Sequence, residues 1–168
     1  MSPWTKRRPQ NDSEVSGYNF FGIDLTSTAA KASACLGLDD KLQLVYFGFA
    51  AKDSDIIAMA NLYSPQVIAI DAPLSLPLGL CCLEESCGCQ PTAGRKSRQC
   101  DQELRQQGIP CYPTSKKTFI KGLIYRGIEL KNNLCQQGFQ IIEIYPYASK
   151  VRLFGKVIPR KTTSQGMA

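Results

Sequence analysis

The chain has 168 residues, which is long enough for one domain with a sizeable core and too short for two domains of ordinary size. Lysine and arginine outnumber aspartate and glutamate by 20 to 14, and the net charge of +6 favours a polyanion such as nucleic acid as a partner, although an ordinary basic soluble protein has the same balance. Histidine is absent, which excludes His-dependent catalytic triads and His-ligated zinc.

The N-terminal residues 1–17 are polar, charged and aperiodic, so they predict a disordered basic tail ahead of one domain over residues 18–168. This tail lacks the apolar stretch of a secretory signal, and no apolar run approaches the roughly 20 residues that span a bilayer. We therefore expect a cytoplasmic protein with no membrane partner. Its eight cysteines would then be reduced thiols or metal ligands rather than disulfides.

The first half of the domain predicts a β-meander followed by one helix and one further strand. Apolar and β-branched residues over 19–27, 32–38 and 42–50 are typical of strands, and the short connections between them favour antiparallel pairing. Apolar residues then recur at roughly helical spacing over 53–63. The solidly apolar run 66–72 indicates a strand inside the sheet.

The second half begins with an irregular stretch, residues 73–112, which holds six of the cysteines and reads as a Cys-rich insertion with a short helix over 97–107. A longer amphipathic helix is predicted over 116–136, a strand over 140–145 and a short helix over 148–154. Together these elements predict an α/β domain in which helices flank a mixed sheet of an antiparallel meander plus parallel strands.

Three of the predicted strands end on a carboxylate, namely Asp24 in FFGIDLTST, Asp71 in VIAIDAPLSLP and Glu143 in IIEIYPYAS. Clustered like charges are tolerable when a cation or a shared proton neutralises them, so these residues predict a divalent-metal site. A strand-end turn with Pro73 is the alternative for Asp71, and a solvated edge position is the alternative for Glu143.

Five motifs follow one another along the domain: GIDLTST, DAPLSLP, R-x-C-D-x-E-L-R at 98–105, CYPTSKKTFIKG and EIYPYASKVRLFG. From Tyr18 to the C-terminus, the chain closely resembles a family of uncharacterised proteins described as predicted nucleases with a ribonuclease H-like (RNase H-like) fold. The resemblance implies that Asp24, Asp71 and Glu143 hold two Mg²⁺ or Mn²⁺ ions for phosphodiester hydrolysis. Proteins of that family continue past the point that corresponds to KTTSQGMA, and RNase H-like nucleases generally take a last acidic ligand from a C-terminal helix. We therefore expect a C-terminally incomplete fold with impaired catalysis.

The cysteines of the insertion are dense enough to favour a bound metal over unassociated thiols, with reduced buried cysteines or redox pairing as the alternatives. Thiolates would suit structural Zn²⁺ or an iron–sulfur cluster. Adjacent cysteines point in different directions along an extended chain, so we expect the ligands to be Cys82, Cys87 and Cys89 with either Cys100 or Cys111, and not Cys81. Cys35 and Cys135 are predicted to be packing residues.

Basic residues lie between the strands that end on Asp71 and Glu143: Arg98, Arg105, Lys116, Lys117 and Lys121. We expect these residues to contact phosphates, and an ordinary solvated helix face is the alternative.

The leading hypothesis is therefore a metal-dependent nuclease that acts on DNA or RNA, and the sequence does not distinguish these substrates. A non-catalytic nucleic-acid-binding module with a Cys-bound structural metal is the alternative. The turn GIDLTST is also similar to the phosphate turn of actin-like and sugar-kinase ATPases. However, Leu25 replaces the glycine of that turn, and 168 residues leave no room for the duplicated domain.

Overall fold

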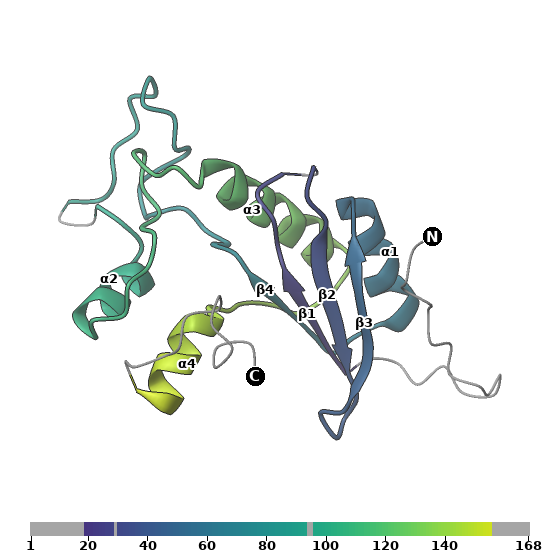
Figure 1. The fold of residues 1–168 in the computed structure, drawn as a ribbon. Coiled ribbons are helices and arrows are strands. Elements are labelled where there is room, and N and C mark those ends of the chain that lie inside the picture. Colours follow the sequence, from purple (N-terminus) through teal and green to yellow (C-terminus); the bar gives the residue numbers. More distant parts are fainter. Residues whose placement is uncertain (1–18, 29, 94–95, 156–168) are drawn as a thin grey trace, which may run out of the picture.

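The computed structural model describes residues 19–28, 30–93 and 96–155, which form one sheet with helices around it (Figure 1). In chain order the elements are β1 (Phe20–Asp24), β2 (Ser33–Leu38), β3 (Leu44–Ala50), α1 (Asp53–Tyr63), β4 (Val67–Asp71), α2 (Gln99–Gln106), α3 (Lys121–Gln136), β5 (Ile141–Glu143) and α4 (Pro146–Phe154). The predicted α/β class is thereby confirmed. The tail predicted over residues 1–17 lies outside the described residues.

The five strands lie in the order β3-β2-β1-β4-β5. The pairs β1–β2 and β2–β3 are antiparallel, which confirms the predicted meander, whereas β4 pairs parallel with β1 and β5 pairs parallel with β4. The mixed sheet predicted from the sequence is therefore present. Because β1, β4 and β5 run in the same direction, their carboxyl ends meet at one edge of the sheet.

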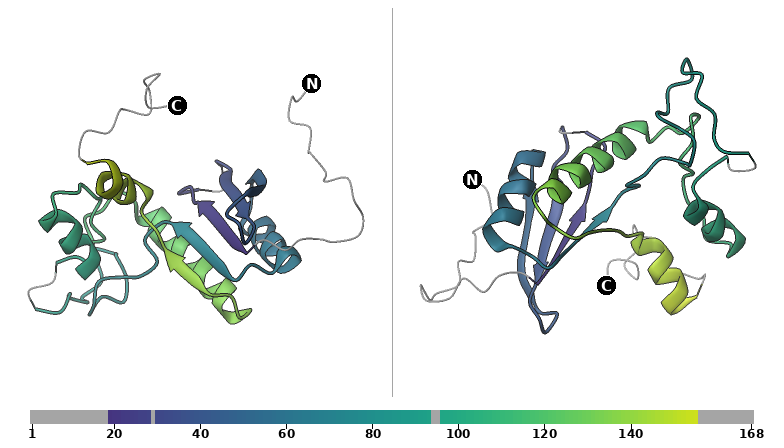
Figure 2. Two further views of the ribbon diagram at one scale, coloured as in Figure 1. Left: turned by 90° about the horizontal axis from the view of Figure 1, so that it is seen from below. Right: turned by 180° about the vertical axis from the view of Figure 1, so that it is seen from behind.

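One face of the sheet packs against α1 and α3 (Figure 2). Alternate residues of β1 and β4 are apolar, as a strand with one face turned to the core requires, and their side chains are at most 2% exposed: Phe21, Ile23, Ile68 and Ile70. The helices contribute pairs of buried residues spaced one turn apart, Ile56 and Ala60 from α1 and Leu130 and Leu134 from α3. This core fixes the sheet and both helices as one unit.

The opposite face of the sheet carries apolar side chains that are exposed. Strand pairing sets Phe47 beside Leu36 and Phe49 beside Ala34, on the side away from buried Cys35. The rings of Phe47 and Phe49 contact each other with centroids 5.5 Å apart, and Phe49 is 62% exposed. α2 and α4 lie near one another in the irregular half of the molecule, away from α1 (Figure 1).

Several predicted boundaries differ from the structure; for example, the strand expected over 19–27 ends at Asp24, and the helix expected from residue 148 begins at Pro146. The helix expected from residue 116 begins at Lys121, because a turn precedes it in which the Thr118 N–H donates to the Ser115 carbonyl oxygen. The strand expected over 140–145 ends at Glu143, since Pro146 is favoured in the first turn of a helix and starts α4. Within the described ranges, no helix is both long and apolar enough to cross a membrane.

Candidate functional site

Asp24 and Asp71 are direct neighbours at the edge where the parallel strands end. In the β1–β4 ladder their Cα atoms are register partners, as are those of Ile23 and Ile70 one step earlier. Paired residues of adjacent strands lie about 5 Å apart and project to the same face. Both carboxylates therefore project from the face opposite to the helices, where Asp24 is exposed and Asp71 is half-buried.

The loop that follows Asp24 is held in place by α3. The Arg126 guanidinium donates to the Thr26 carbonyl oxygen at 2.6 Å and to the Asp53 carboxylate at 2.6 Å. The Ser33 hydroxyl accepts the Thr26 N–H at 3.3 Å. Arg126 is not among the residues predicted from the sequence, although a charged residue beside the buried stripe of a helix is a usable signal, because burial of arginine requires partners.

Glu143 is oriented differently from the other two carboxylates. Its register partner in β4 is Ile70, whose side chain points into the core, so the β5 ladder directs Glu143 toward the helix-covered side of the sheet. One of its carboxylate oxygens accepts the Leu74 N–H at 2.8 Å and the Arg98 guanidinium at 2.6 Å. In this arrangement the Glu143 carboxylate is bound by protein groups, the Leu74 N–H and the Arg98 guanidinium.

Arg98 and Asp101 form a buried ion pair beside Glu143. The guanidinium donates to both carboxylate oxygens of Asp101, at 2.7 and 3.4 Å, and Asp101 also accepts the Thr114 N–H at 2.9 Å. Burial disfavours the charge of Arg98, but its hydrogen bonds with Glu143 and Asp101 outweigh this effect and raise its pKa above the ordinary value. The sequence predicted Arg98 only as a phosphate contact and missed Asp101, although their spacing of three residues was visible.

These groups line a cleft of about 370 Å³ next to the ends of β4 and β5. Asp71, Arg98 and Glu143 lie in its wall together with Tyr145, whose hydroxyl donates to the Pro110 carbonyl oxygen at 2.8 Å. The cleft therefore joins one strand-end carboxylate to the Arg98 ion-pair network. Asp24 is not among its lining residues.

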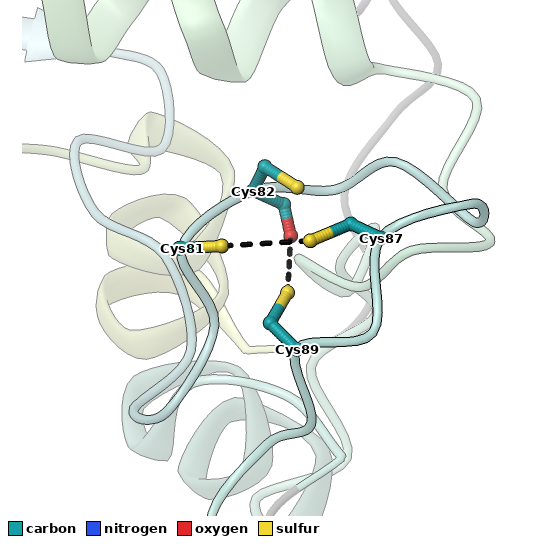
Figure 3. Close-up of side chains that lie close together, drawn as sticks. All are labelled: Cys81, Cys82, Cys87 and Cys89. Carbon is teal, nitrogen blue, oxygen red and sulfur yellow. Dashed lines mark hydrogen bonds between the residues drawn. The ribbon is translucent and has the colours of Figure 1, made fainter.

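Among the described residues, one group of three or more acidic or cysteine side chains has all its ligand atoms within 4.8 Å of one another: Cys81, Cys82, Cys87 and Cys89. This cysteine cluster could hold a metal ion such as zinc. Figure 3 shows Cys81 and Cys87 pointing toward one another across the loop, with Cys89 pointing toward the space between them. The three strand-end carboxylates do not form such a group.

The membership of the cysteine cluster differs from the prediction, because Cys81 takes the place expected for Cys100 or Cys111. The chain bends at Cys81 instead of running extended, so the adjacent Cys82 can share its surroundings. Cys100 and Cys111 lie instead against Asp101, at 3.8 Å from its carboxylate and 3.6 Å from its carbonyl oxygen. Burial raises the pKa of both of these thiols.

The thiols of the cysteine cluster interact strongly with one another. Hydrogen bonds with Cys89, and next with Cys87 and Cys82, raise the pKa of Cys81 to about 12. Hydrogen bonds with the backbone of Cys82 and Cys81 lower the pKa of Cys89 to about 6. A lowered pKa favours the thiolate form of Cys89, which is the form that binds metals.

The other predicted basic residues lie in unlike surroundings. Arg105 of α2 and Lys117 are exposed, whereas Lys121, the first residue of α3, is half-buried. The Lys116 ammonium donates to the Cys87 carbonyl oxygen and thus belongs to the surroundings of the cysteine cluster. Of the five residues predicted to contact phosphates, Arg105 and Lys117 are the most accessible.

The fold and the site define an α/β protein with a five-stranded mixed sheet and a cysteine cluster able to hold a metal ion. The chain belongs to the family described as protein of unknown function DUF429, whose family model matches residues 22–168. Comparison with curated proteins found no match, and comparison with solved structures found none either.

Proposed function

We propose that this protein is an RNase H-like nuclease that hydrolyses phosphodiester bonds of DNA or RNA with the help of Mg²⁺ or Mn²⁺. The observation that carries the proposal is the parallel register of Asp24 and Asp71, two carboxylates side by side at the carboxyl ends of the central strands. The antiparallel meander followed by a helix and parallel strands supports it, because this order of elements is part of the chain's resemblance to RNase H-like folds.

The donor chemistry of this carboxylate pair suits a small hard cation. Mg²⁺ is usually bound through one or two carboxylates and keeps several water molecules, so Asp24 and Asp71 would suffice to hold one ion. A cation bound there would lower the pKa of a water molecule and stabilise the leaving oxygen of a phosphodiester. The exposure of Asp24 leaves the site open to a large substrate.

A two-metal mechanism needs more metal ligands than Asp24 and Asp71 provide. Glu143, which lines the same cleft as Asp71, is a further candidate ligand, and it would have to give up its bond to Arg98 at 2.6 Å before it could join. Arg98 would then be free to approach a phosphate, as the sequence predicted for it. Exposed Arg105 and Lys117 would contact the nucleic-acid backbone without reading its sequence.

The test is Mn²⁺ binding to the purified chain, measured by isothermal titration calorimetry and by the loss of the electron paramagnetic resonance signal of free Mn²⁺. We expect Asp24→Asn and Asp71→Asn each to weaken binding by about tenfold or more, because each removes one charged ligand. The matched control is Asp40→Asn, the same chemical change in the β2–β3 turn at the opposite end of the sheet.

Mn²⁺-dependent cleavage of DNA or RNA that disappears in Asp71→Asn would support the nuclease directly. The proposal fails if the wild-type chain does not bind Mn²⁺, or if all three variants bind it as tightly as the wild type.

The second candidate is a nucleic-acid-binding module without catalysis. It is favoured by the bonds that Glu143 makes with Arg98 and Leu74, which occupy its carboxylate and keep it from serving the carboxylate pair as a ligand. Such a module would bind nucleic acid with an affinity that falls steeply as salt rises, and Asp71→Asn would leave that affinity unchanged. Filter binding of single- and double-stranded DNA and RNA at several salt concentrations separates the two candidates.

A further inference from the structure

Residues 78–92 form a loop whose two ends are tied together, and this loop contains the cysteine cluster. The Thr92 N–H donates to the Leu78 carbonyl oxygen at 2.8 Å. Gly79 adopts a φ of +92°, and a Cβ at this position would lie 2.7 Å from the Thr92 nitrogen. Glycine meets both demands, since it tolerates positive φ and has no Cβ. The base of the loop is therefore closed by the backbone itself.

The loop is also fastened to α3 and to the segment before it. Leu83 is fully buried, and its N–H donates to the Tyr125 hydroxyl of α3 at 2.7 Å. The same hydroxyl donates to the Glu84 carboxylate at 3.0 Å, and the Lys116 ammonium donates to the Cys87 carbonyl oxygen. These bonds set the four cysteines in a defined position relative to the rest of the fold.

The separation of the sulfur atoms suits a single metal ion. In a tetrahedral site with Zn–S bonds of about 2.3 Å, neighbouring sulfurs lie about 3.8 Å apart. The Cys81 and Cys87 sulfurs are 3.6 Å apart, and all four sulfurs lie within 4.8 Å of one another. A disulfide would require about 2.05 Å, and all four cysteines are free thiols. An iron–sulfur cluster would place several metal atoms among the thiolates and would need them further apart.

We propose that Cys81, Cys82, Cys87 and Cys89 bind one structural Zn²⁺ ion that cross-links the 78–92 loop. The donor set consists of four sulfurs and no oxygen, which selects a soft or borderline ion and excludes Mg²⁺ and Mn²⁺. Four protein ligands fill the tetrahedron, so the site has no open position for a substrate and its role is structural.

The surroundings complement the charge of such a centre. Four thiolates on one Zn²⁺ carry a net charge of −2, and the Lys116 ammonium bound to the Cys87 carbonyl oxygen lies beside them. Each thiol that binds the metal releases its proton to the solvent, so the binding reaction is a proton exchange without any redox step. The site stands independently of the proposed nuclease activity, because it shares no residue with the strand-end carboxylates.

The first test is the metal content of the full chain, purified without chelator from zinc-supplemented cells and measured by inductively coupled plasma mass spectrometry. We expect one zinc per chain in the wild type, and near-complete loss in Cys87→Ser and Cys89→Ser. The matched controls are Cys100→Ser and Cys135→Ser, which remove thiols outside the cysteine cluster and should retain the zinc.

A second measurement covers the case in which a cysteine variant does not fold. Co²⁺ added to the reduced, metal-free wild type should give the intense visible absorption bands of tetrahedral cobalt thiolate, and one equivalent of Zn²⁺ should abolish them. Hydrogen exchange should slow within residues 78–92 on zinc addition, while exchange in β1 and β4 stays unchanged.

The proposal is overturned if the wild type contains no stoichiometric zinc and shows no cobalt bands. It is equally overturned if Cys100→Ser loses as much metal as Cys87→Ser, or if thiol counting of the native protein reveals a Cys81–Cys87 disulfide. A visible iron spectrum with several irons per chain would assign the four cysteines to a cluster and would also sink the zinc site. Failure of Mn²⁺ binding at Asp71 would leave this proposal untouched.

Discussion

Arg98 illustrates how one buried charge can organise a site. Its guanidinium bridges Asp101 at the start of α2 and Glu143 at the end of β5, two elements that are distant in the sequence. Arg98 is 8% exposed and Asp101 only 2%, so neither charge can rely on water. Breaking such a pair leaves an uncompensated buried charge, which costs much more than the loss of a surface contact.

We predict that Arg98→Ala lowers the free energy of unfolding by about 3–5 kcal/mol, because Asp101 loses its cationic partner in the interior. The control is Arg105→Ala in α2, the helix that Arg98 precedes, at an exposed position where a change within about 0.5 kcal/mol is expected. Urea denaturation followed by circular dichroism measures both values. Equal, small changes in the two variants would show that the buried pair contributes no more than a surface charge.

At the scale of elements, the close approach of α3 to the chain after β4 positions Asp71. Gly127 faces this segment, and a Cβ there would lie 2.9 Å from the Pro73 carbonyl oxygen and 3.2 Å from the Ala72 Cβ. The contact is tight against backbone, which cannot move aside as a flexible side chain could. The position of Asp71 thus depends on glycine, which has no side chain, at position 127 of α3.

We predict that Gly127→Ala destabilises the protein by about 1–3 kcal/mol through overpacking, even though alanine is about 1 kcal/mol better than glycine inside a helix. The comparison variant is Glu129→Ala, which changes an exposed residue of the same helix and should be nearly neutral. Thermal and urea unfolding of both proteins test this. A Gly127→Ala protein more stable than the wild type would show that α3 can move away from Pro73 at little cost.

For the molecule as a whole, the uneven cover of the sheet is the main physical feature. α1 and α3 bury one face, while Phe47, Phe49 and Ile142 on the other face are between 41% and 62% exposed. Contiguous exposed apolar surface favours self-association in water. Changes to this exposed face should therefore affect the solubility of the protein more than they affect its free energy of unfolding.

We predict that the double substitution Phe47→Ser and Phe49→Ser reduces concentration-dependent association, with little change in the free energy of unfolding beyond the loss of their mutual ring contact. Static light scattering over a concentration series reads out the first effect, and urea denaturation the second. As a reference, Phe21→Ala on the buried face should cost about 3–5 kcal/mol. Unchanged scattering in the double variant would show that the exposed face does not associate.

The sequence by itself determined which segments form strands and helices, and that two carboxylates end the central strands. Apolar alternation in FFGID and VIAID is a local property, and it specifies β1 and β4 with Asp24 and Asp71 at their ends. The helix expected over 53–63 matches α1, because its apolar spacing is also local. The boundaries at Lys121 and Glu143 differ from the expected ones, since turns and a proline outweigh periodicity there.

The tertiary structure alone decided which of these side chains meet. The register between β4 and β5 sets Glu143 opposite Ile70, on the core side of the sheet, and a one-residue shift in pairing would have reversed its direction. The bend at Cys81 brings that thiol, rather than Cys100 or Cys111, into the cysteine cluster. The long connection between β4 and α2 folds so that Arg98 is buried and pairs with Glu143. Such contacts join residues far apart in the chain, and no local periodicity encodes them.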